Sequence, residues 1–152
     1  MTLPYTAKTY TGKAFKPVPK VTAQVGGKTL TLKNKTDYTV AYKNNKAAGK
    51  ATVTVTGTGN YTGTLTKTFT IKPVKIATVT LAKTSMPYTG KAVKPKVTVK
   101  ARVAGKSVTL KVGTDYTVKY VNNVKAGTAK VIVTGKGNFT GTVTKTFKIV
   151  KK

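Results

Sequence analysis

One long segment occurs twice in this chain. Residues 36–63 (TDYTVAYKNNKAAGKATVTVTGTGNYTG) return as residues 114–141 (TDYTVKYVNNVKAGTAKVIVTGKGNFTG). Residues 10–71 align with residues 88–149 at an offset of 78 without a gap, and 40 of the 62 pairs are identical. A repeat of this length predicts two similar small domains. We expect the chain to divide into repeat 1 (1–73), a short linker (74–76) and repeat 2 (77–152).

Each copy carries the alternation of apolar and polar residues that is typical of strands, punctuated by Asn and Gly turns. In the central hairpin, Tyr38, Val40 and Tyr42 share one face, which we expect to be the core face. Asn and Gly tolerate positive φ, and in the connection that follows they stand at Asn44, Asn45 and Gly49. Helical periodicity is absent, so the sequence predicts an all-β protein.

The last strand of copy one is expected over residues 62–71. Its parity places Leu65, Phe69 and Ile71 inward and the intervening threonines outward. Threonine suits the solvent face of a strand. Val53 and Val55 of the preceding strand should also face the core.

Positive charge dominates the composition. Among 152 residues there are 29 Lys and Arg, of which only Arg102 is arginine, and two acidic residues, giving a net charge of +27. A field of this size attracts polyanions. Lysine is a hydrated point charge, whereas sequence-specific base reading favours bidentate arginine. The composition therefore favours diffuse attraction over specific nucleic-acid recognition.

Residues suited to catalysis or metal binding are scarce. Cys, His, Trp and Glu are absent, and Ser85 and Ser107 are the only serines. No disulfide, histidine base, paired carboxylates or metal-ligand cluster can form, and no dinucleotide or phosphate-loop motif is present. We therefore expect neither an enzyme nor a bound cofactor or metal. No apolar run is long enough to span a membrane.

The two copies act as a control on each other, because residues with specific chemistry in both should recur in both. Few lysines recur, although both halves remain strongly positive, so lysine behaves as a bulk property. The recurring lysines outside the last strand are the candidate polyanion-binding residues: Lys13, Lys16, Lys28, Lys33, Lys91, Lys94, Lys106 and Lys111. For stacking on nucleic-acid bases, the exposed aromatic candidates reduce to Tyr5, Tyr10 and Tyr88.

The two aspartates, Asp37 and Asp115, follow polar loops at the start of a strand. A carboxylate there commonly accepts backbone hydrogen bonds. Lys67 and Lys145 share strand parity with inward residues, and a buried unpaired lysine is costly. Either an isopeptide bond to an asparagine, assisted by the aspartate, removes that charge, or a β-bulge or rim position exposes it.

The recurring pattern YTGK, L-x4-DYTV-x-Y-x-NN, TG-x-GN-[YF]-TG and KTF-x-I covers nearly the whole chain, twice. It resembles the tandem immunoglobulin-like repeats of Gram-positive bacterial surface proteins. The resemblance implies two tandem immunoglobulin-like β-sandwich domains in a secreted or wall-attached protein. Such repeats serve as stalks, adhesin segments and spacers, and they are usually nearer neutral or acidic than this chain.

The expected function is a non-enzymatic structural and adhesive module of an extracellular cell-surface or cell-wall protein. Its expected partners are anionic polymers, either wall phosphate polymers or acidic glycans, bound through diffuse lysine charge. A passive spacer whose charge only prevents aggregation is the first alternative. Non-specific nucleic-acid binding and self-assembly of exposed edge strands into a filament are the others.

Overall fold

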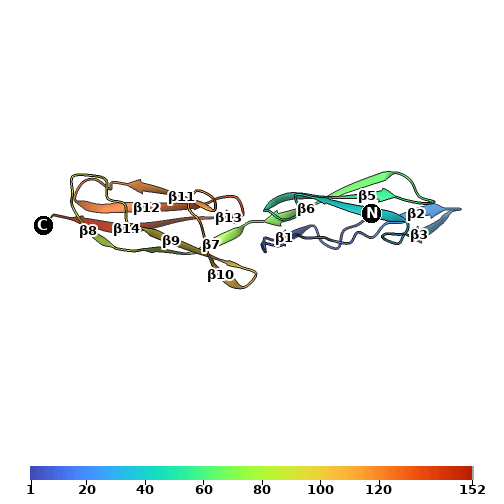
Figure 1. Ribbon diagram of the computed structural model, residues 1–152, viewed down its shortest axis with the longest axis horizontal. Coiled ribbons are helices and arrows are strands. Elements are labelled where there is room, and N and C mark those ends of the chain that lie inside the picture. The colour runs from blue at the N-terminus through green and yellow to red at the C-terminus, as the bar shows by residue number, and fades with distance from the viewer. Residues whose placement is uncertain (152) are drawn as a thin grey trace. The chain divides into compact units, whose positions relative to one another are not determined.

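The computed structural model describes residues 1–151 and is all-β, with no helix in that range. The chain separates into two compact units, Met1–Lys72 (unit 1) and Pro73–Lys152 (unit 2). Each unit contains more than one sheet, as a sandwich-like fold requires (Figure 1).

Unit 1 contains two sheets. Its strands are β1 (Ala7–Thr9), β2 (Thr22–Val25), β3 (Lys28–Thr31), β4 (Tyr38–Lys43), β5 (Gly49–Gly57) and β6 (Thr64–Lys72). The larger sheet has the order β1-β6-β5-β4, with β1 parallel to β6 and the other pairs antiparallel. The smaller sheet is the hairpin β2-β3.

Unit 2 repeats this plan with additional strands. Its strands are β7 (Val74–Leu81), β8 (Ser85–Pro87), β9 (Val97–Val103), β10 (Lys106–Thr109), β11 (Tyr116–Val121), β12 (Gly127–Gly135), β13 (Phe139–Thr140) and β14 (Thr142–Val150). The sheet β11-β12-β14-β8 corresponds to the larger sheet of unit 1. The hairpin β9-β10 corresponds to β2-β3, but here it continues through β7 to β13.

The central hairpin forms as predicted. β4 and β5 pair in a continuous register from Tyr38 opposite Gly57 to Lys43 opposite Thr52. The turn between them uses positive φ at Asn44 (56°) and Gly49 (134°), the conformation that asparagine and glycine tolerate best. Unit 2 has similar values, 57° at Asn122 and 131° at Gly127.

The buried apolar side chains of unit 1 form two clusters. In unit 1, one cluster joins Val21 and Leu32, which flank β2-β3, to Tyr38 and Val55 of the larger sheet. A second cluster contains Ala51, Val53, Phe69 and Ile71, each at most 2% exposed. Burying a side chain of this size stabilises a fold by roughly 1.5–3 kcal/mol. The predicted core-facing positions are thus confirmed, with one exception.

The exception is Leu65, which is 48% exposed. β1 pairs with β6 only at Thr70–Lys72, and the first half of β6 lies at the sheet edge. Parity places Leu65 on the inner side, but among residues 1–151 the pairing of β1 with β6 begins only at Thr70, five residues further on.

The expected linker also differs from the structure. Residues 74–76 form the beginning of β7, and Val74 and Ile76 are buried at 8% and 5% exposure. The two apolar side chains pack into unit 2, so this segment is part of a sheet rather than a free connection.

Candidate functional site

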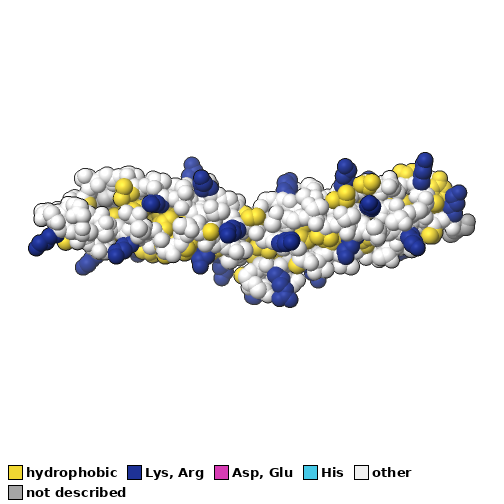
Figure 2. Space-filling view, turned by 180° about the vertical axis from the view of Figure 1, so that it is seen from behind, with side chains coloured by type: hydrophobic (Ala, Val, Ile, Leu, Met, Phe, Trp, Pro, Cys, Tyr) yellow, Lys and Arg dark blue, Asp and Glu magenta, His cyan; other side chains and the backbone are white. Residues whose placement is uncertain are grey.

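The candidate polyanion-binding lysines are all exposed. Lys28 and Lys106 begin β3 and β10, and the other six lie outside the strands. Every other lysine from Lys8 to Lys151 is exposed as well, and no charged residue among residues 1–151 is buried. Figure 2 shows lysine and arginine side chains distributed over the visible face of each unit, with no single dense patch.

The two aspartates are engaged by backbone groups. One carboxylate oxygen of Asp37 accepts a hydrogen bond of 2.7 Å from the Lys33 N–H, and Asp115 accepts one of 2.9 Å from Lys111. These are the backbone hydrogen bonds predicted for the two aspartates. Neither carboxylate forms an ion pair within the described residues. The lysine charge is therefore not compensated inside the protein.

Lys67 and Lys145 are both exposed, which agrees with the second of the two alternatives, a bulge or rim position. The ladders β5-β6 and β12-β14 run without a register shift past both residues, so no bulge turns them outward. Each lies at the rim, where a long side chain reaches water. With the charge solvated, the reason to expect an isopeptide bond involving Asp37 or Asp115 disappears.

Lysine and threonine share the outer faces of the larger sheets. In unit 1, Lys43 pairs with Thr52, which pairs in turn with Thr68, and Lys50 pairs with Thr70. In unit 2, Lys130 pairs with Thr146 and Lys148 with Thr128. Ammonium and hydroxyl groups both donate hydrogen bonds to anionic oxygens. These rows are suited to weak, repeated contacts with a polyanion.

Two of the three candidate aromatic platforms are engaged in packing. The Tyr5 ring meets Phe69 edge-on at 5.6 Å between centroids, and Tyr10 packs against the same core cluster. Tyr88 is 45% exposed. Of these three candidates, Tyr88 alone presents an exposed ring, which gives little stacking surface for single-stranded nucleic acid.

Sequence reasoning did not foresee what the recurring tyrosines and asparagines do. The hydroxyls of Tyr42 and Tyr120 donate to the carbonyls of Pro17 and Pro95 at 2.8 and 2.9 Å. Burial raises the pKa of Tyr42, with smaller effects from Tyr5 and Tyr38. Burial also raises the pKa of Tyr120, with a smaller effect from Tyr116. The one available signal was the recurrence of each tyrosine with a proline 25 residues earlier.

The second asparagine of each NN pair fastens the hairpin loop to the segment before β2 or β9. The side-chain amide of Asn45 donates to the Phe15 carbonyl at 2.7 Å, and the Phe15 N–H donates to the Asn45 carbonyl at 2.8 Å. Asn123 and Val93 form the same pair of bonds at 3.0 and 2.7 Å. The asparagines are structural in both units.

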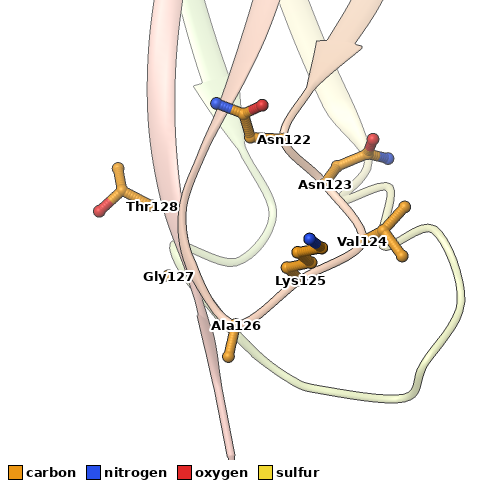
Figure 3. A pocket seen from close by; sticks show the side chains of 7 residues that line it. All are labelled: Asn122, Asn123, Val124, Lys125, Ala126, Gly127 and Thr128. Atoms are coloured by element: carbon orange, nitrogen blue, oxygen red, sulfur yellow. The ribbon is translucent and has the colours of Figure 1, made fainter.

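The hairpin loop of unit 2 encloses an open hollow of about 530 Å³, lined by residues 122–128 (Figure 3). Lys125 is its only charged side chain. In Figure 3 the side chains of Asn123 and Val124 lie on one side of the loop and Thr128 on the other. Asn123 and Thr128 therefore do not converge on one position, as the polar groups of a specific ligand site would.

Residues 1–151 contain no group of three or more acidic, His or Cys side chains placed to hold a metal ion. The same residues include no helix with the length and apolarity of a membrane span. Comparison with known protein families, with characterised proteins and with solved structures finds no match to this chain.

Proposed function

We propose that this chain forms two tandem immunoglobulin-like domains of an extracellular bacterial surface protein, a non-enzymatic module that attaches to anionic polymers. The polymers are wall phosphate polymers or acidic glycans. The observation that carries this proposal is the state of the charges: every lysine from Lys8 to Lys151 is exposed, and both aspartates are engaged by backbone groups. The resemblance of the repeat to bacterial surface repeats supplies the setting.

Attachment follows from the distribution of charge. Each lysine that neutralises an anionic group releases a condensed counterion, so affinity falls steeply as salt rises. The hollows described in the two units are lined by one lysine or none, except one of about 420 Å³ beside Tyr88, where Lys125 and Lys151 both contribute. Affinity should therefore depend on the charge density of the polymer rather than on its sugar or base sequence.

The test is retention of the whole chain on teichoic acid, DNA, an acidic polysaccharide and a neutral glycan between about 50 and 200 mM salt. We expect retention on all three polyanions, a steep loss with salt, and none on the neutral glycan. A chain that is not retained even at the lowest salt contradicts attachment and leaves the passive spacer. Retention on DNA alone contradicts the proposed ligand class and favours nucleic-acid binding.

Two matched variants test whether the charge is diffuse. One replaces Lys13, Lys16, Lys91 and Lys94 by glutamine, and the other replaces Lys28, Lys33, Lys106 and Lys111. Both remove four exposed charges, two from each unit. Diffuse attraction predicts equal losses of affinity and equal reductions of the salt dependence. Unequal losses would locate a binding site on the surface with the larger effect and contradict the diffuse mechanism.

A further inference from the structure

The two units differ at one edge of one sheet. In unit 2 the hairpin β9-β10 is extended by β7, which in turn pairs with β13. In unit 1 the corresponding hairpin β2-β3 stands alone as a two-stranded sheet within the described residues. Figure 1 shows β7 running beside β9. Among residues 1–151, the sheet that contains β2 has only one other strand, β3.

In unit 2 the first residues of β7 lie between β9 and β13 and pair with both strands. Ile76 pairs antiparallel with Ala101 of β9, with an irregularity at Ala77. Val74 pairs parallel with Phe139 of β13, and its N–H donates to the Asn138 carbonyl at 2.9 Å. Val74 and Ile76 point inward and are buried, while Lys75 between them is exposed.

The same place in unit 1 is an open groove of about 250 Å³. Val21 and Ala23 form one wall at the edge of β2, and Tyr61 and Leu65 form the opposite wall. Its floor includes Leu32 and Val55 of the core. Most of the residues that line the groove are apolar, and β2 and the beginning of β6 both contribute to it.

Side chains around the groove are more exposed than their counterparts 78 residues later. Tyr61 is half-buried but Phe139 is 6% exposed, and Ala23 is half-buried but Ala101 is fully buried. A Cβ built on Gly141 would lie 3.3 Å from the Lys75 side chain, whereas one built on Gly63 meets nothing within 4 Å. The side chains of unit 2 are more buried because β7 covers these positions there.

Unit 1 already contains the first backbone hydrogen bonds of the ladder that a further strand would continue. Thr2 and Lys20 exchange two backbone hydrogen bonds of 2.8 and 2.9 Å in an antiparallel bridge. At the offset of 78 this bridge corresponds to the pair Thr80 and Thr98 of unit 2. Unit 2 continues the ladder through Ile76, whereas in unit 1 the outer edge of Thr22–Val25 is unpaired within residues 1–151.

We propose that the groove of unit 1 accepts one extended peptide strand with the pattern of Val74-Lys75-Ile76, two aliphatic residues separated by an outward polar residue. The occupant runs antiparallel to β2 and parallel to Tyr61–Thr62, as β7 runs in unit 2. Backbone hydrogen bonds supply affinity in such strand addition, and pockets for alternate side chains supply selectivity. The groove would act as a junction at which a strand-bearing segment joins unit 1.

A single strand fits the groove better than a second copy of the chain. The groove has walls on both sides, so an entering strand must be free at both of its own edges. The β2 edge of another copy carries β3 and the rest of its unit with it. Repulsion between two chains of +27 also opposes pairing of copies.

The test places a strand in register without altering any existing residue. Residues 72–78 are copied directly in front of Met1, which aligns with Val79, so the copied valine and isoleucine take the positions of Val74 and Ile76. A matched extension carries serine at those two positions. Amide hydrogen exchange is measured along Thr22–Val25, with the β9 amides of unit 2 as an internal reference.

We expect the aliphatic extension to slow exchange along β2 by at least about tenfold, and the serine extension to have little effect. In the extended chain, Leu65→Asp should abolish the protection. The same substitution should leave the unfolding midpoint of the original chain nearly unchanged, because Leu65 is 48% exposed. Equal exchange with both extensions, or protection of β2 in the original chain through dimerisation, overturns the proposal.

Discussion

The hydroxyl of Tyr42 donates a hydrogen bond of 2.8 Å to the carbonyl oxygen of Pro17, 25 residues earlier in the chain. Tyr120 makes the same bond to Pro95 at 2.9 Å, also across 25 residues. In each unit the bond fastens the segment before β2 or β9 to the central hairpin. A proline has no N–H to donate to a neighbouring strand, so it keeps this segment out of the hydrogen-bonded sheet. Part of the repeated DYTV-x-Y motif is therefore explained by tertiary hydrogen bonding rather than by ligand binding.

Removing this hydroxyl should weaken each unit separately. We expect Tyr42→Phe and Tyr120→Phe each to lower the free energy of unfolding by about 1 kcal/mol, because each substitution deletes one hydrogen bond but keeps the ring. Denaturant unfolding measures the change. Tyr88→Phe is the control, since this ring is 45% exposed, and it should change stability by less than about 0.5 kcal/mol. A loss as large in the control would contradict a specific role for the two bonds.

Stability should also fall at alkaline pH. Burial raises the pKa values of Tyr42 and Tyr120 above the ordinary value near 10. Above about pH 10 the unfolded chain releases these protons first, so the folded state holds more protons and the free energy of unfolding decreases as pH rises. Below about pH 10 the hydroxyls are protonated in both the folded and the unfolded state, and their contribution to the free energy of unfolding is fully present.

At alkaline pH the lysines also lose their charge, and this changes stability equally in the original chain and in the double variant Tyr42→Phe and Tyr120→Phe. The difference in stability between the two proteins therefore reports the tyrosine hydroxyls alone. The stability advantage of the original chain should be constant from about pH 7 to 9 and shrink above about pH 10. Denaturant unfolding at each pH gives the comparison. An advantage that stays constant to pH 11 would show that the pKa values of the two hydroxyls do not differ between the folded and unfolded states.

The asparagine clamp gives a prediction for the hairpin loops. Asn45→Ala should cost about 1 kcal/mol, because the Phe15 carbonyl loses its side-chain donor, and Asn123→Ala should cost a similar amount. Asn44→Gly is the control, since φ at Asn44 is 56° and glycine adopts that conformation without strain. Denaturant unfolding distinguishes them, and equal costs at both asparagines would contradict the clamp.

Gly57 and Gly135 are required by close packing of backbone. A Cβ at Gly57 would lie 2.8 Å from the Tyr61 carbonyl oxygen, and one at Gly135 would lie 2.7 Å from the Thr140 nitrogen. We expect Gly57→Ala and Gly135→Ala each to destabilise by about 1–3 kcal/mol, because backbone must shift to admit the methyl group. Thr56→Ala, on the outward face of the same strand, should cost much less. A thermal shift series measures these differences, and a neutral Gly57→Ala would refute the packing argument.

The exposed position of Lys67 and Lys145 predicts that neither forms an isopeptide bond. Each such bond releases one ammonia, so the intact mass should equal that calculated from the sequence. Lys67→Gln and Lys145→Gln should leave the unfolding midpoint nearly unchanged, since both side chains lie in solvent. A mass lower by one ammonia, abolished by one of these variants, would contradict the rim position.

The repeat, the alternation and the turn residues were sufficient to predict the all-β class and the inward face of β4. They also predicted the positive φ at Asn44 and the backbone bonds of Asp37. These features are local: strand parity and turn conformation depend on residues adjacent in the chain. The exposure of the candidate lysines belongs with them, because long charged side chains rarely remain buried.

Only the tertiary structure decided which inward positions are covered. Parity places Leu65 and Lys67 on the side of Phe69, but only Phe69 is buried, because the rings of Tyr5 and Phe15 pack against it. Val74 and Ile76 were expected in a linker, yet they occupy a gap between strands far away in the sequence. Alternation specifies the side to which a residue points, whereas burial depends on whether a distant segment lies over that side.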